Sequence, residues 1–103
     1  MDEAALLTLL ETTNLPVAYH HYVSPPAPPY VAYLFVYSDN FGADNKVYQA
    51  SDNYQVELYT TKKDPTSEKL IEDLFESNDI FWDKSETWIE SEGLYQVAYE
   101  IGG

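Results

Sequence analysis

Apolar residues recur at helical spacing in two segments of the chain. In residues 2–13, four leucines gather within two turns behind Asp2, a residue suited to capping a helix N-terminus. Residues 64–78 begin with Asp64 and Pro65, a capping carboxylate followed by the residue favoured at the first helical position. The apolar stripe of this second segment consists of Leu70, Ile71, Leu74 and Phe75. Both segments are expected to be helices with one buried face.

Other segments have the composition of β-strands. Residues 30–37 (YVAYLFVY) are apolar throughout, which predicts a central strand covered on both faces. Residues 54–61 alternate, which is typical of a strand with one buried face formed by Tyr54, Val56, Leu58 and Thr60. Further strands are expected at residues 17–23, at 82–89 and 94–101 around a Ser91-Glu92-Gly93 turn, and, as a short element, at 46–50.

The order of these elements predicts a single domain over residues 1–103. Its fold class is α+β, with two helices packed on a mostly antiparallel sheet of four to five strands in the order α-β-β-(β)-β-α-β-β. Residues 24–29 contain four prolines and are expected to form a stiff connector. Residues 39–45 are rich in turn formers and are expected to form an exposed loop.

The charge of the chain excludes several classes of ligand. Eighteen Asp and Glu against five Lys and no Arg give a formal net charge of −13. Binding to nucleic acid depends on cationic side chains that neutralise phosphates, so no direct nucleic-acid contact is expected, and anionic membranes are disfavoured for the same reason. The start of the chain is acidic where a signal peptide would be basic, and no apolar run is long enough to cross a membrane.

No arrangement of residues indicates catalysis, a cofactor or a metal. His20 and His21 are adjacent, and neighbouring residues of a strand point to opposite faces, so the two rings are not expected to share an ion unless that segment is irregular. Asp39, Asp44 and Asp52 lack the spacing of a calcium loop. The chain is therefore expected not to be an enzyme, and a carboxylate-dependent hydrolase is the least favoured reading.

The second helix carries an acidic stripe. Glu68, Glu72 and Glu76 lie at intervals of four residues, and Asp79 follows near the negative end of the helix dipole. Each like-charged neighbour costs about 0.2–0.5 kcal/mol. This predicted acidic surface has two interpretations: a solvated face that keeps the protein soluble, or a face that repels a polyanion or attracts a basic partner.

Tyrosine and proline point to protein contacts. The chain has ten tyrosines, more than a small core needs, and tyrosine is enriched in interfaces as well as in strands. Loops held by a rigid sheet can adapt to a partner, so residues 24–29 and 38–44 are hypothesised to engage partners. The interface residues predicted on this basis are Pro25, Pro26, Pro28, Pro29, Tyr30, Asp39, Asn40, Phe41 and Tyr59.

Several segments together resemble a known family. They are Asn-Leu-Pro-Val-Ala-Tyr (14–19), Pro-Pro-Tyr-Val-Ala-Tyr (28–33), Ser-Asp-Asn-Phe-Gly-Ala-Asp-Asn (38–45), Tyr-Gln-Val-Glu-Leu-Tyr-Thr-Thr-Lys-Lys-Asp-Pro (54–65) and Trp-Ile-Glu-Ser-Glu-Gly-Leu-Tyr-Gln-Val-Ala-Tyr-Glu-Ile (88–101). In this order they resemble the small acidic head–tail joining proteins of siphophages and prophages of Gram-positive bacteria, and the elements are similar to those of tail terminators, also called tail-completion proteins. The motifs are structural rather than catalytic.

The resemblance implies a virion assembly role. Such subunits, which can be monomers before assembly, form a homo-oligomeric, hexameric ring at the head-proximal end of the tail. The ring stops growth of the tail tube and contacts both the tail-tube protein and the head–tail connector proteins, after assembly in the host cytoplasm. Acidic residues facing the lumen of such a ring would repel the DNA that passes through it. The alternative interpretation is an acidic inhibitor or DNA mimic that occupies a basic site on a host or phage protein.

Overall fold

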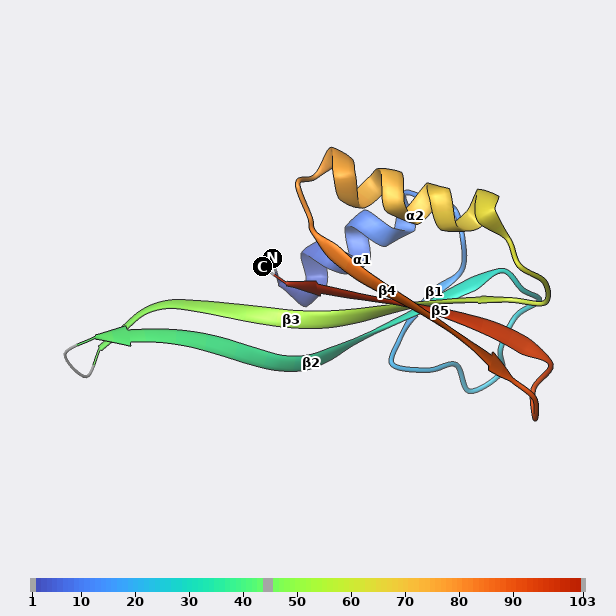
Figure 1. Cartoon of the computed structure of the whole chain (residues 1–103), viewed down its shortest axis with the longest axis horizontal. Coiled ribbons are helices and arrows are strands. Elements are labelled where there is room, and N and C mark those ends of the chain that lie inside the picture. The colour runs from blue at the N-terminus through green and yellow to red at the C-terminus, as the bar shows by residue number, and fades with distance from the viewer. Residues whose placement is uncertain (1, 44–45, 103) are drawn as a thin grey trace.

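The computed structural model describes the backbone of residues 2–43 and 46–102, and the side chains of residues 2–38 and 52–102. Its elements are α1 (Glu3–Glu11), β1 (Val17–Tyr19), β2 (Tyr30–Ala43), β3 (Lys46–Thr60), α2 (Pro65–Ser77), β4 (Trp82–Ile89) and β5 (Leu94–Gly102). Figure 1 shows both helices on one face of a five-stranded sheet. The predicted α+β class and the order of its elements are confirmed.

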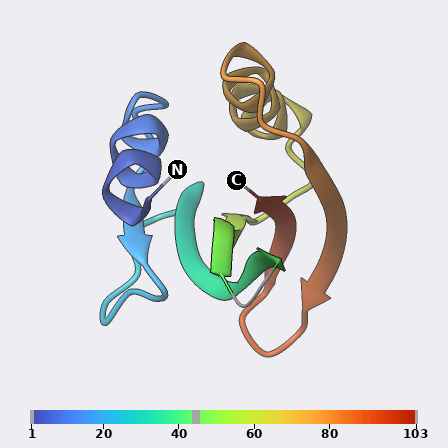
Figure 2. The ribbon, with the colours of Figure 1, turned by 90° about the vertical axis from the view of Figure 1, so that its left-hand side faces the viewer.

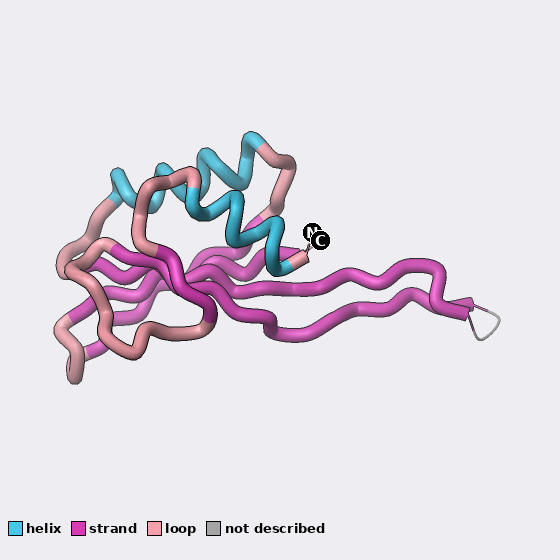
Figure 3. The backbone as a smooth tube through the Cα atoms, turned by 180° about the vertical axis from the view of Figure 1, so that it is seen from behind, coloured by secondary structure: helices cyan, strands magenta, loops and turns pink. Residues whose placement is uncertain are grey.

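The sheet has the strand order β1-β2-β3-β5-β4. β1 pairs parallel to β2, and all other neighbours are antiparallel. The sheet is strongly curved, as the end-on view in Figure 2 shows. Figure 3 shows the connection between β1 and β2 passing over the face that the helices leave open.

The helices begin where the sequence predicts. The Asp2 carboxylate accepts a hydrogen bond from the Ala5 backbone N–H at 2.8 Å. Asp64 caps α2 in the same way, accepting from the backbone N–H of Ser67 at 3.1 Å and from its hydroxyl at 2.8 Å. Each carboxylate therefore satisfies a donor that the first helical turn leaves unpaired.

The core lies between the helices and the sheet. α1 contributes two leucines, and α2 contributes Ile71 and Phe75. Leu70 is 45% exposed, so its predicted place in the buried stripe is wrong. The sheet contributes the predicted face of β3, with Tyr54, Val56, Leu58 and Thr60 all buried. The buried core cluster is Leu6, Leu10, Val31, Tyr33, Tyr54, Val56, Leu58, Ile71, Phe75, Val97, Tyr99 and Ile101.

Two predicted strands differ in extent from the observed ones. β1 ends at Tyr19 instead of residue 23, because the next residue, His20, has a positive φ of 67°. A left-handed backbone cannot continue a strand. The predicted short strand at 46–50 and the strand at 54–61 form one element, β3, of 15 residues.

The largest departure from the prediction is a projecting β-hairpin. β2 and β3 stay paired from Tyr30 opposite Tyr59 out to Ala43 opposite Lys46. Most of the loop predicted at residues 39–45 is therefore strand; residues 44–45 lie outside the described residues. Figure 1 shows the outer part of this hairpin extending well past the rest of the sheet, and the molecule measures 51 × 29 × 22 Å. We call residues 37–43 and 46–52 the arm.

Candidate interaction surfaces

Within the residues that the structure describes, the arm is a two-stranded ribbon with no third strand beside it. β5 pairs with β3 only from Asn53 onwards, and β1 pairs with β2 only at residues 31–33. A shift of register between Phe35 and Tyr37 leaves Val36 without a partner in the ladder, and such a bulge bends and twists a strand. Both backbone edges of the arm are therefore available to another chain.

Apolar side chains gather at the base of the arm. Phe35, Val36 and Tyr37 are each between 41% and 48% exposed, so the prediction that residues 30–37 are covered on both faces holds only for their first half. Phe81, between α2 and β4, is 90% exposed. Tyr37 and Phe81 line one open groove of about 410 Å³.

The groove gives the base of the arm a mixed chemistry. Trp82 and Ile101 add apolar surface, and the carboxylates of Asp83 and Glu100 add negative charge. Exposed aromatic side chains beside an unpaired strand edge are typical of a protein contact site. The sequence did not reveal this site, because Phe81 belongs to no periodic segment and a loop at residues 39–45 with only a short strand at 46–50 was expected where the arm lies.

The predicted interface residues do not form one surface. Pro25, Pro26, Pro28 and Pro29 lie in the loop between β1 and β2, where Pro25 is exposed and the others are half-buried. Tyr30 is buried, contrary to the prediction, because its ring stacks on Tyr59 at a centroid distance of 5.0 Å. The backbone of Asp39, Asn40 and Phe41 belongs to β2 in the arm, and their side chains lie outside the described residues.

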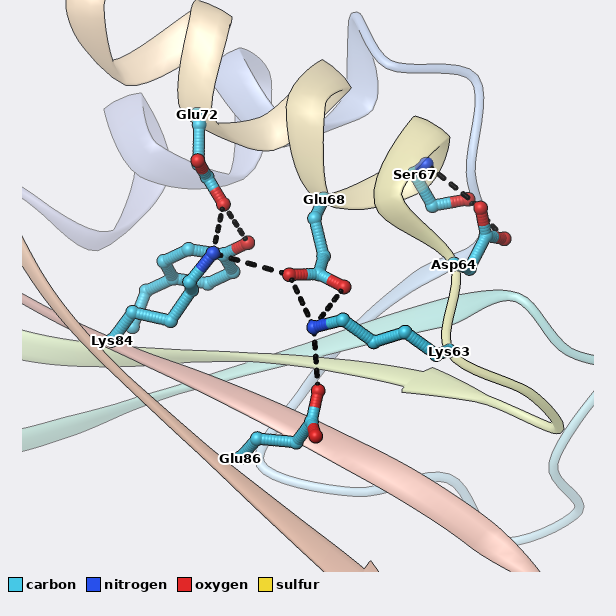
Figure 4. Close-up of polar contacts among 8 residues, drawn as sticks. Lys63, Asp64, Ser67, Glu68, Glu72, Lys84 and Glu86 are labelled. Carbon is cyan, nitrogen blue, oxygen red and sulfur yellow. Dashed lines mark hydrogen bonds and ion pairs between the residues drawn. The ribbon is translucent and has the colours of Figure 1, made fainter.

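The predicted acidic surface of α2 is only partly a surface. Glu68 is buried, contrary to the prediction, and lies against the sheet between two lysines (Figure 4). Lys63 Nζ lies 2.8 Å from Glu68 Oε2, and Lys84 Nζ lies 3.2 Å from Glu68 Oε1. Glu76 and Asp79 are exposed, as expected. α2 therefore does not present to solvent the regular stripe of charge that a DNA mimic would need.

The lysines connect Glu68 to further carboxylates. Lys84 Nζ also lies 2.9 Å from Glu72 Oε2, which accepts a hydrogen bond from the Tyr99 hydroxyl at 2.8 Å. Lys63 Nζ also lies 2.6 Å from Glu86 Oε1. We call Lys63, Glu68, Glu72, Lys84, Glu86 and Tyr99 the ion-pair network. It joins the N-terminal half of α2 to β4 and β5.

Hydrogen bonds in the network shift the pKa of its members. Burial alone would raise the pKa of Glu68, but the bonds from Lys63 and Lys84 outweigh it and hold the pKa below the ordinary value of 4.5. Burial, followed by the hydrogen bond to Glu72, raises the pKa of Tyr99 far above its usual range. The network therefore keeps Glu68 as a carboxylate and Tyr99 as a neutral phenol, which suits a structural link rather than proton transfer at neutral pH.

The two histidines lie closer together than predicted. Their Nδ1 atoms are 3.0 Å apart, and the rings meet edge to face. The left-handed backbone of His20 turns the strand aside, so the expectation of opposite faces is wrong. Within the described residues, no three His, Cys, Asp or Glu side chains are placed to hold a metal ion. Of the aspartates considered for calcium, Asp52 is half-buried, the Asp39 side chain is outside the described residues, and so is Asp44.

Comparison with known proteins adds no relative. The sequence matches no model of a known protein family, and no curated protein matches it significantly. No helix within residues 2–43 and 46–102 combines the length and the apolar character needed to cross a membrane. Function is therefore inferred from the surfaces described above and from the resemblance seen in the sequence.

Proposed function

We propose that this chain is a non-enzymatic phage assembly protein. In this proposal it forms a ring at the head-proximal end of a siphophage tail, where it terminates the tail tube and joins it to the head connector. Its partners are copies of itself, the tail-tube protein and the connector proteins. The position in the virion is inferred from the sequence resemblance, and the way in which subunits contact their partners is inferred from the arm.

The projecting arm is the observation that supports assembly. A two-stranded ribbon is marginally stable in water, and its two unpaired edges can pair with strands of a neighbour. The apolar groove at its base supplies a second and different contact surface on the same subunit. A closed ring needs two such unlike surfaces, each facing the other on the next subunit.

Removal of the arm tests this proposal. Tyr37 and Asn53 are paired across the two strands, so an Asn-Gly turn can replace residues 38–52 and close a short hairpin. The core cluster found among the described side chains lies outside residues 38–52, so the shortened protein should keep its fold, as judged by circular dichroism. We expect the wild type, but not the shortened protein, to form a complex with tail-tube protein in size-exclusion chromatography with light scattering.

Two controls make the test decisive. Leu70→Ser removes an exposed apolar side chain on α2 and should leave assembly intact, whereas Phe81→Ser, at the base of the arm, should weaken it. A wild type that forms neither a ring nor a complex with tail-tube protein would contradict the proposal. So would a shortened protein that assembles as well as the wild type, because the arm would then not be the contact.

A further inference from the structure

A small aromatic pocket lies at the end of the molecule opposite the arm. The loop between β1 and β2 folds over the open face of the sheet there, as Figure 3 shows. The pocket has a volume of about 110 Å³ and is lined by Tyr22, Pro25, Tyr30, Tyr59 and Glu92, together with the histidine pair. A water molecule takes about 30 Å³, so the pocket has room for the end of one side chain.

The lining is rich in electrons. Tyr22 meets Tyr30 edge to face at 5.3 Å between ring centroids, and Tyr30 stacks on Tyr59. The faces of tyrosine rings and their hydroxyl oxygens are negative, which favours a cation. Glu92, in the turn between β4 and β5, adds a carboxylate. Burial and then the charge of Glu92 raise the pKa of Tyr30, so the negative potential of this carboxylate reaches the ring.

One polar atom at the pocket has no partner. The Tyr22 hydroxyl is buried and makes no hydrogen bond to the described residues. A buried polar atom left unpaired costs about 1–3 kcal/mol, so native structures seldom leave one without a use. The hydroxyl oxygen can accept a hydrogen bond from an N–H donor that enters the pocket. Ammonium and guanidinium groups are donors of this kind.

We propose that this pocket binds the cationic end of one lysine or arginine side chain of a basic partner protein. Charge complementarity favours such a partner, since this chain has a net charge of −13 and no arginine. Its own Lys63, Lys69 and Lys84 are already in ion pairs with its carboxylates. The inference goes beyond the proposed ring, because the pocket lies away from the arm and needs no second copy.

The test uses a matched pair of small probes. Butylammonium carries the end of a lysine side chain, and butanol has a similar chain without the charge. We expect butylammonium, at low salt, to cause saturable NMR shift changes at Tyr22, Tyr30 and Tyr59, and butanol to cause none at the same concentrations. Glu92→Gln should weaken butylammonium binding about two- to tenfold, as expected for loss of one charge contact at a partly exposed site.

Two further variants separate the pocket from general charge effects. Tyr22→Phe keeps the ring but removes the unpaired hydroxyl, so it should remain folded and bind butylammonium more weakly. Glu76→Gln removes one exposed charge from α2 and should not change binding. The proposal is overturned if butanol shifts the same signals, if Glu76→Gln weakens binding as much as Glu92→Gln, or if butylammonium gives no saturable shift.

The arm-shortened protein distinguishes this inference from the proposed ring. It keeps the whole pocket, so it should bind butylammonium as the wild type does. Loss of assembly with intact binding would support both proposals. Intact assembly with loss of binding would overturn both.

Discussion

Among single residues, Glu68 differs most from what the helical pattern predicted. It was expected on a solvated face, yet it lies in the interface between α2 and the sheet. Burying a carboxylate is costly unless cations compensate it. Lys84 on β4 and Lys63 in the loop before α2 supply that compensation. Periodicity along a helix cannot reveal an ion-pair partner that a strand of the sheet provides.

Replacement of Lys84 should therefore destabilise the protein. Lys84→Met leaves Glu68 with Lys63 alone, and we expect a loss of about 1–3 kcal/mol, less than for a fully buried pair because Lys84 is partly exposed. Lys69→Met is the matched control, since Lys69 and Asp73 form an exposed pair on the same helix that solvent and salt screen, and its loss should cost much less. Urea unfolding measures both. If both variants lost the same free energy of unfolding, the ion-pair network would contribute no more than an exposed ion pair.

The pKa of Glu68 predicts how stability depends on pH. Because this pKa is lower in the folded protein than its ordinary value of 4.5, the unfolded chain takes up the proton first as pH falls. The stabilisation is complete above about pH 4.5 and is lost as pH falls through the folded value. We expect Glu68→Gln to make the decline of stability below pH 4.5 shallower in urea unfolding. An unchanged decline would contradict the role of Glu68; Glu76→Gln is the control.

At the scale of elements, the arm and the body differ in protection. Central β3 residues have strands on both sides, whereas the described residues of the arm pair with one strand only. In the isolated protein we expect the described amides of the arm to exchange with deuterium about tenfold or more faster than those of Val56 and Leu58. Assembly should slow exchange in the arm. Equal rates in the free protein would contradict an uncovered ribbon.

The helices could be predicted from sequence more fully than the strands. Asp2, Asp64 and Pro65 are local signals, because capping depends on the next few residues only. The length of the arm depends on pairing between β2 and β3, and turn-forming residues 39–45 gave no sign of it. The exposure of Phe35 to Tyr37 likewise depends on where the helices end over the sheet. The pocket requires three tyrosines from separate segments to meet, which spacing cannot show.

For the whole molecule, the net charge predicts opposite salt effects on the two proposed contacts. Copies of a chain with charge −13 repel one another, and salt screens that repulsion over about 8–10 Å. Self-assembly through the arm and its apolar base should therefore strengthen between 50 and 300 mM salt, roughly within the range where screening acts. Butylammonium binding should weaken over the same range. Sedimentation measures self-assembly and NMR titration measures butylammonium binding. If salt strengthened both or weakened both, the contact whose response differs from the expected one would be contradicted.

The ion-pair network also determines how the chain can be chemically labelled. Acylating reagents attack a neutral amine, and hydrogen bonds to Glu68 and Glu86 raise the pKa of Lys63, while those to Glu72 and Glu68 raise that of Lys84. These two amines should therefore react slowly while α2 rests on β4. The rate at which Lys84 is acylated would therefore measure how often α2 separates from β4.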